Sequence, residues 1–238
     1  MQAFLTILKY DFGQLSQSWV SRIWIIVMII PAIFLIFLAN YENEFASETM
    51  AFYTATVLMP ASGLAIAVLS ASSINVESGI IADSILSRAI TRTEYVCAKI
   101  LSRMGFILVT YSIVIIPFSY FMLRYGVNDT ADSSVFLGWI VIGSILTAVA
   151  AFGILMSVLF ANLLPAVLLV LLTVSLSSAL MQFLGLELLS ISAVIQELPE
   201  IFRGETLTST GIQIIGIFLI LTSIFLFPAV FIFGKKDL

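Results

Sequence analysis

The chain has 238 residues, of which 61% are hydrophobic and only 10% are charged, and its mean hydropathy is +1.17. Soluble globular domains are about half apolar and a quarter charged, so this composition excludes them and indicates an all-α polytopic membrane protein. The formal net charge of −4 leaves no basic face for a phosphate backbone, which excludes nucleic acid as a partner.

Residues 1–22 predict an amphipathic helix. Its apolar side would carry Phe4, Leu8, Phe12, Leu15 and Trp19. We expect such a helix to lie in the interface of the lipid bilayer. A cleaved signal peptide is the alternative, which Asp11 disfavours because it interrupts the apolar run that such a signal needs.

Six apolar segments are each long enough to cross a hydrocarbon core of ~30 Å. They lie at residues 23–39, 50–74, 104–123, 135–160, 163–183 and 212–233, and together they make residues 1–238 a single transmembrane domain. Small residues recur at helical spacing at Gly63, Ala67 and Ala71 in the second span and at Ser144, Ala148, Gly153 and Ser157 in the fourth. Such stripes favour close packing between helices.

Residues 184–210 are too polar to span a membrane and too apolar to form a free loop. Leu188, Ile191, Ile195 and Leu198 lie on one helical face, and Pro199 interrupts the pattern. We expect one or two short helices here, dipping into the outer interface before the last span.

The loop at residues 77–103 is the long polar segment that is also rich in cations, with Arg88, Arg92, Lys99 and Arg103. Lys and Arg near the ends of spans favour the cytoplasm, so we expect this loop there. We expect a short helix, a turn and then a second helix, because Thr91 and Glu94 match a capping box that would open this second helix at Tyr95 and lead into the third span.

The remaining cations support the same orientation. Lys9, Arg22, Lys235 and Lys236 would lie on the side of this loop, against Arg124 and Arg203 on the other side. With six spans, both termini are then cytoplasmic.

Several kinds of chemistry lack the residues that they need. The sequence has no G-x-x-x-x-G-K-[ST] run, so we expect no ATP hydrolysis by this chain. It has no histidine and a single cysteine, Cys97, so we expect no metal site and no cofactor. The six segments contain no Asp, Glu, Lys or Arg, which disfavours both a cation-coupled carrier and an intramembrane hydrolase.

The fifth segment carries the densest polar stripe, at Ser175, Ser178 and Gln182. These positions share one helical face and could hydrogen-bond a passing substrate. The alternative is that the serines bond to their own helix or to a neighbouring one. A path without ionisable groups suits a lipid-like, peptide or drug-like cargo better than a metal ion.

The cytoplasmic loop resembles the loop between spans two and three of ABC-2 type transporter permeases. The resemblance rests on Glu77, Gly79, residues 84–92 (SILSRAITR), Tyr95 and Lys99. The chain departs from the family at Ala89 and Ala98, where proline and glycine are common. The layout of an interfacial N-terminal helix, six spans and short re-entrant outer helices is similar to the family's over the full length.

The resemblance implies a permease subunit that exports an amphipathic molecule across the plasma (inner) membrane. Two copies of a separate ATP-binding subunit would bind ATP and Mg, and a coupling helix would contact them through Glu77, Gly79, Arg88, Arg92, Tyr95 and Lys99. A second permease copy, or a related permease, would complete the complex. The alternatives are a structural or scaffold subunit of a larger membrane complex and a cation-coupled carrier, and co-purification of an ATPase distinguishes the first reading from both.

Overall fold

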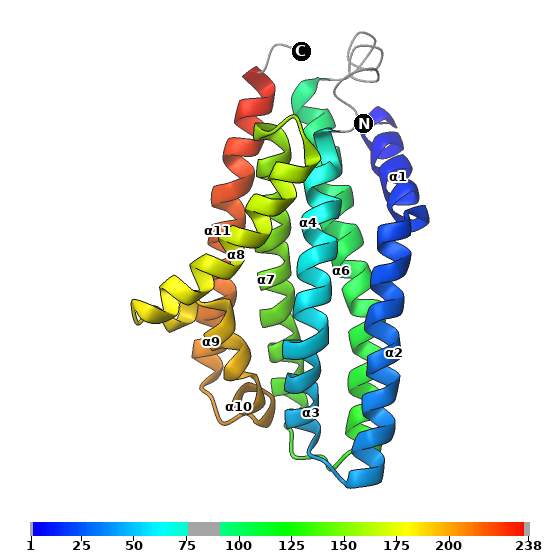
Figure 1. Ribbon diagram of the computed structural model, residues 1–238, viewed down its shortest axis with the longest axis vertical. Helices are drawn as coiled ribbons and strands as arrows, with labels where there is room; N and C mark the ends of the chain where they lie inside the picture. Colours follow the sequence, from blue (N-terminus) through cyan, green and yellow to red (C-terminus); the bar gives the residue numbers. More distant parts are fainter. Residues whose placement is uncertain (1, 76–90, 236–238) are drawn as a thin grey trace.

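The computed structural model describes residues 2–75 and 91–235, which form a bundle of helices (Figure 1). In chain order the helices are α1 (Gln2–Gln17), α2 (Trp19–Glu42), α3 (Ala46–Tyr53), the π-helical turn η1 (Thr54–Leu58), α4 (Met59–Asn75), α6 (Arg92–Tyr125), α7 (Asp132–Leu159), α8 (Leu163–Phe183), the 3-10 turn η2 (Glu187–Leu189), α9 (Ile191–Gln196), α10 (Leu198–Arg203) and α11 (Thr208–Lys235). α1 and the end of α11 lie at the same end of the bundle, which we call the terminal end, and the opposite end is the distal end (Figure 1).

The six predicted spans are confirmed as six helices that, over the described residues, are long and apolar enough to cross a membrane. They are Trp19–Glu42, Ala46–Ser73, Thr93–Tyr125, Ser133–Leu159, Leu163–Phe183 and Thr208–Lys235. The second of these is continuous through α3, η1 and α4. The third is 33 residues long, which is well beyond the ~20 that cross a hydrocarbon core.

The π-helical turn at Thr54–Leu58 was not expected from the sequence, and it has a local cause. Pro60 follows it by two residues and has no N–H to donate to the carbonyl of Thr56, four residues earlier. The helix accommodates this by widening for one turn. The side chains of Thr54 and Thr56 stabilise the turn by donating to the carbonyl oxygens of Met50 and Phe52, at 2.8 and 2.7 Å.

α7 is the centre of the bundle. Of its span, 78% is buried, compared with 17% for α8 and 22% for α11. α4, α6, α8 and α11 all pack against it. Two of the small residues predicted to favour close packing do so, because Gly153 faces Ser70 of α4, and the hydroxyls of Ser157 and Ser73 lie 2.8 Å apart, whereas Gly63 has no neighbour within 4 Å of an added Cβ.

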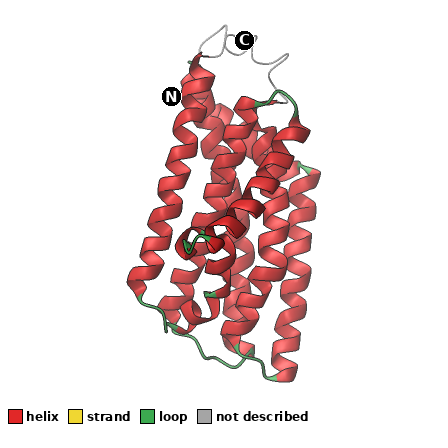
Figure 2. Ribbon diagram, turned by 60° about the vertical axis from the view of Figure 1, so that its left-hand side comes forward, coloured by secondary structure: helices red, strands yellow, loops and turns green. Residues whose placement is uncertain are grey.

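The helix expected over residues 1–22 ends at Gln17, because Ser18 caps α2, and Trp19, expected on its apolar side, is the exposed first residue of α2. α1 continues upward from α2 and lies alongside α6 (Figures 1 and 2). The ring of Phe12 packs edge-on against Phe106 at 5.3 Å, and Leu15 is buried. The part of the apolar side around Phe12 and Leu15 therefore packs against protein.

Toward the distal end, the one or two short helices expected in residues 184–210 are present as α9 and α10, preceded by the 3-10 turn η2. Leu198 is fully buried, and Leu188, Ile191 and Ile195 are half-buried. Pro199 lies in the first turn of α10, where a missing N–H costs nothing. α8 is tilted and ends partway along the bundle, so that η2, α9 and α10 complete the chain's path to the distal end (Figure 1).

Candidate functional site

Three of the residues predicted to couple to a partner, Arg92, Tyr95 and Lys99, lie on α6 where it begins at the terminal end. Glu77, Gly79 and Arg88 lie outside the described residues, as does most of the predicted loop. The capping box is confirmed. The Oγ1 of Thr91 accepts from the Glu94 N–H at 3.3 Å, and a Glu94 carboxylate oxygen accepts from the Thr91 N–H at 3.1 Å.

α6 therefore begins at Arg92, and the next two predicted coupling residues lie on it. Tyr95 is 6% exposed, and its ring stacks on Phe233 of α11 at 6.1 Å. Lys99 is 3% exposed. In this conformation both side chains lie inside the terminal end, where they hold helices together, and a direct contact with a partner would require them to move.

Lys99 belongs to a buried ion cluster that the sequence did not suggest. Its Nζ donates to Asp11 of α1 at 2.7 Å. Arg103 binds the same carboxylate through Nε and Nη2 at 3.2 and 3.3 Å, and the Ser102 hydroxyl also donates to it. Asp11 is 0% and Arg103 7% exposed, so the charges are excluded from water.

The spacing of these residues explains the cluster. Lys99, Ser102 and Arg103 stand at i, i+3 and i+4, on one face of α6. Asp11 falls within the apolar stripe of Leu8, Phe12 and Leu15, so the packing that buries the stripe also buries the carboxylate. The position of Asp11 is the sequence feature that could have revealed the cluster, because one acid at the centre of an apolar helix face needs a buried partner.

The cluster also reaches α4. The Nη1 of Arg103 donates to the Leu69 carbonyl oxygen and to the Ser72 hydroxyl, the latter at 3.1 Å. One guanidinium thus connects α1, α4 and α6. We call Asp11, Lys99, Ser102 and Arg103, with their contacts on α4, the terminal clamp.

Electrostatics keep Asp11 ionised. Burial alone would raise the pKa of this carboxyl, but the charges of Arg103 and Lys99 and the hydrogen bonds from Lys99 and Ser102 outweigh burial and lower it. Two cations face one carboxylate, and the Lys99 ammonium also lies 5.8 Å from the Tyr95 ring centroid. Asp11 is therefore held in the clamp as a carboxylate paired with two cations.

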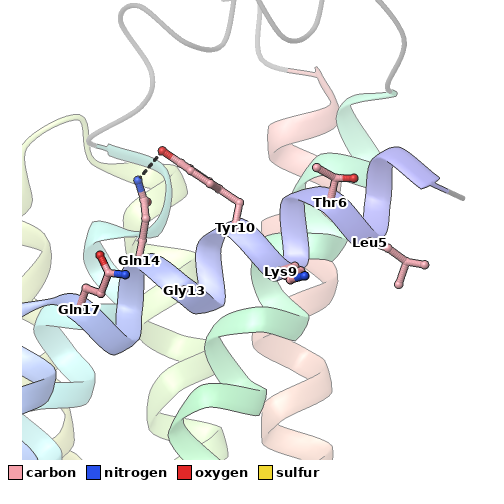
Figure 3. A pocket seen from close by; sticks show the side chains of 7 residues that line it. All are labelled: Leu5, Thr6, Lys9, Tyr10, Gly13, Gln14 and Gln17. Carbon is pink, nitrogen blue, oxygen red and sulfur yellow. Dashed lines mark hydrogen bonds between the residues drawn. The ribbon is translucent and has the colours of Figure 1, made fainter.

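The side of α1 opposite the clamp is exposed (Figure 3). It carries Leu5, Thr6, Lys9, Tyr10, Gly13, Gln14 and Gln17 along a shallow groove of about 670 Å³. Within it, Gln14 donates to the Tyr10 hydroxyl at 2.9 Å. All lining residues belong to α1, so no second element encloses a ligand here.

The polar stripe predicted on α8 is divided in the structure. Ser178 lies in a network with Ser190 and Ser192 of the α9 region, where it accepts from the Ser192 N–H at 2.9 Å. Gln182 accepts from the Ser192 hydroxyl at 3.4 Å. Ser175 is exposed and has no hydrogen bond within the described part of the chain. The structure thus brings Ser178 and Gln182 together and leaves Ser175 apart.

A second polar cluster joins three segments at the distal end. Asp129, in the loop before α7, accepts from the hydroxyl and the N–H of Ser47 at 2.5 and 3.0 Å. Arg203 of α10 donates to Asp129 at 3.1 Å and to Glu48 at 2.6 Å. We call these four residues the distal clasp.

The distal clasp predicts an acid-sensitive contribution to stability. Burial would raise the pKa of Asp129, but hydrogen bonds from Ser47 and Arg203 lower it below its ordinary value of 3.8. A lowered pKa stabilises the fold above 3.8, and this contribution is lost as pH falls through the folded-state pKa. Asp129→Asn should lower Tm at pH 7 by roughly 2–4 °C for ~1 kcal/mol of lost hydrogen bonding.

The measurement is the Tm of wild type and variant in detergent from pH 7 down to pH 3. The difference in Tm should shrink as the wild-type carboxyl becomes protonated. Glu42→Gln, an exposed acid at the same end, is the control and should have little effect. A difference that stays constant to pH 3 would show that Asp129 does not act through its charge.

Among residues 2–75 and 91–235, no three Asp, Glu or Cys side chains come together as ligands for a metal ion. Comparison of the chain with protein-family models, with curated proteins and with solved structures gives no match.

Proposed function

We propose that the chain is the membrane-spanning permease subunit of an ABC transporter of the ABC-2 type. Its six spans would move an amphipathic lipid-like, peptide or drug-like molecule outward, and two copies of a separate subunit would hydrolyse the ATP. The proposal draws on the sequence resemblance at residues 77–99 together with the arrangement of helices around that segment. A second copy of the chain, or a related permease, would complete the path.

The terminal clamp is the observation that carries the proposal. The segment that resembles a coupling helix leaves from α4 and returns into α6, and Arg103 joins these two helices to each other and to α1. A push on the segment would therefore move the three helices together. Such rigid-body motion is how interfaces transmit conformational change to distant sites.

The charge distribution supports a cytoplasmic terminal end. The cations on the side of the terminal end are Lys9 on α1, Arg22 in the first turn of α2, Lys99 and Arg103 in the first part of α6, and Lys235 at the end of α11. Arg124 lies at the opposite end of α6, and Arg203 ends α10. By the positive-inside rule, the terminal end and the predicted coupling segment then face the cytoplasm, where an ATP-binding subunit would be.

Asp11 bears on the alternative of a cation-coupled carrier. It is a buried acid of the kind that such carriers use. However, Lys99 and Arg103 keep its pKa low, so that it stays ionised through the pH range in which a proton carrier works. The ABC permease remains the better proposal.

The test is to purify the tagged chain from its native membrane and to ask whether a P-loop ATPase accompanies it. Arg88→Glu together with Arg92→Glu should prevent assembly or reduce transport-dependent ATP hydrolysis several-fold. Each single change should do less, because an exposed ion pair contributes only ~0–1 kcal/mol.

Lys9→Glu provides the matched control, since Lys9 is an exposed cation at the same end. It should leave assembly and ATP hydrolysis intact. If the double reversal behaves like this control, the coupling assignment is wrong. If no ATPase accompanies the chain, the scaffold alternative becomes the better one.

A further inference from the structure

A cavity of about 220 Å³ lies between α7, α8 and α11. α8 and α11 both pack on α7, and η2 and α9 bridge them toward the distal end through Leu189 and Ile191. Its floor is buried, with Ala148 5% and Phe218 3% exposed. The cavity thus lies where α8 and α11 separate from each other on the surface of α7.

The size and lining of the cavity suit one aromatic ring. An apolar cavity of ~150 Å³ is large enough to bind benzene. Phe152 and Phe225 lie on the cavity with ring centroids 5.1 Å apart and planes tilted by 56°, and Phe218 lies on its floor. Aromatic rings favour such tilted contacts, and the Met181 thioether on the α8 side also packs well against ring edges.

One polar group on the cavity wall has no partner. Thr173 on α8 is an exposed residue that lines the cavity, and its hydroxyl makes no hydrogen bond within the described residues. By contrast, Ser177 on the same wall donates to the Val174 carbonyl oxygen at 3.2 Å, and Thr222 of α11 donates to Phe218 at 2.8 Å. Because the Thr173 hydroxyl is accessible and has no partner of its own, it is open to a hydrogen bond from a ligand that enters between α8 and α11.

We infer that this cavity is a binding site for an aromatic ring that carries one hydrogen-bonding substituent, with the ring among Phe152, Phe218 and Phe225 and the substituent at Thr173. The α8 face that lines it, Thr173, Ser177 and Met181, is not the stripe of Ser175, Ser178 and Gln182. Binding requires only this chain, so the inference goes beyond the proposed function and does not depend on it.

The experiment uses the purified full chain in lipid nanodiscs. Phenol and toluene compete against a photoreactive diazirine-phenol, and peptide mass spectrometry locates the labelled residues. Label is expected on α7, α8 and α11 around the cavity. Thr173→Val, which keeps the size of the side chain and removes its hydroxyl, should weaken phenol about three- to tenfold and leave toluene unchanged.

Ser175→Val is the matched control, because Ser175 is an exposed residue of the same helix outside the cavity. It should bind both competitors like the wild type. Ser177→Phe should fill the cavity and remove labelling there. Labelling that is spread over lipid-facing residues, or that Ser177→Phe leaves unchanged, would overturn the site. Equal phenol affinity in Thr173→Val and wild type would overturn the assigned hydrogen bond. Neither result would bear on the ATPase partner.

Discussion

Replacing Asp11 by asparagine is expected to lower the Tm of the protein more than any other change of one charged residue described above. The substitution leaves Lys99 and Arg103 buried with no counter-charge, at 3% and 7% exposure. Removing one partner of a buried ion pair costs about 3–5 kcal/mol. For a chain of this size that corresponds to a fall in Tm of roughly 6–20 °C, measured by thermal unfolding in detergent.

A second variant tests the cause. Asp11→Leu combined with Lys99→Met and Arg103→Met removes all three charges and keeps similar volumes. Replacing a whole buried ion cluster by apolar residues is often neutral, so this protein should recover most of the lost Tm. Gln17→Ala, on the exposed side of α1, is the control. If Asp11→Asn unfolds at the wild-type temperature, the terminal clamp does not contribute to stability.

Local sequence patterns predicted most of the fold. The six spans follow from runs of apolar residues, and the fifth was predicted with the bounds that the structure has, Leu163–Phe183. The capping box at Thr91 and Glu94 lies within four consecutive residues, so the sequence alone specifies it. Such features depend on neighbours in the chain, which is why they could be predicted.

The clamp and the clasp could not be predicted in the same way. Lys99 is 88 residues from Asp11, and Arg203 is 74 residues from Asp129. Which charges meet depends on how α1 and α10 pack, and hydropathy carries no information about such pairing. For the same reason the amphipathic pattern of α1 suggested a lipid contact, because an apolar stripe looks alike whether it faces lipid or α6.

Gly153→Ala is expected to have the second large effect, because it forces α4 and α7 apart. A Cβ on residue 153 would overlap the Ser70 hydroxyl and lie 2.8 Å from the Ser70 Cβ. Ser70 is fully buried and cannot swing away, since it is held by its bond to the Ile66 carbonyl oxygen. Overpacking of this kind costs about 1–3 kcal/mol, which for this chain is roughly 2–12 °C in Tm.

The small-residue stripe offers its own control. Gly63 belongs to the stripe on α4, but a Cβ there would meet nothing within 4 Å. Gly63→Ala should therefore be neutral, or should stabilise the helix by up to ~1 kcal/mol. The two substitutions add the same methyl group to membrane helices, so a difference between them isolates the contact with Ser70.

Adding Ser70→Gly to Gly153→Ala should restore much of the lost Tm, because it removes both atoms that the new methyl group meets. The two changes would then be less harmful together than the sum of their separate effects, a coupling expected only for residues in contact. The bond between Ser73 and Ser157, one turn along the same pair of helices, should be regained as the helices close. If the effects of the two changes on Tm simply add, then the loss of stability in Gly153→Ala does not come from the contact between α4 and α7.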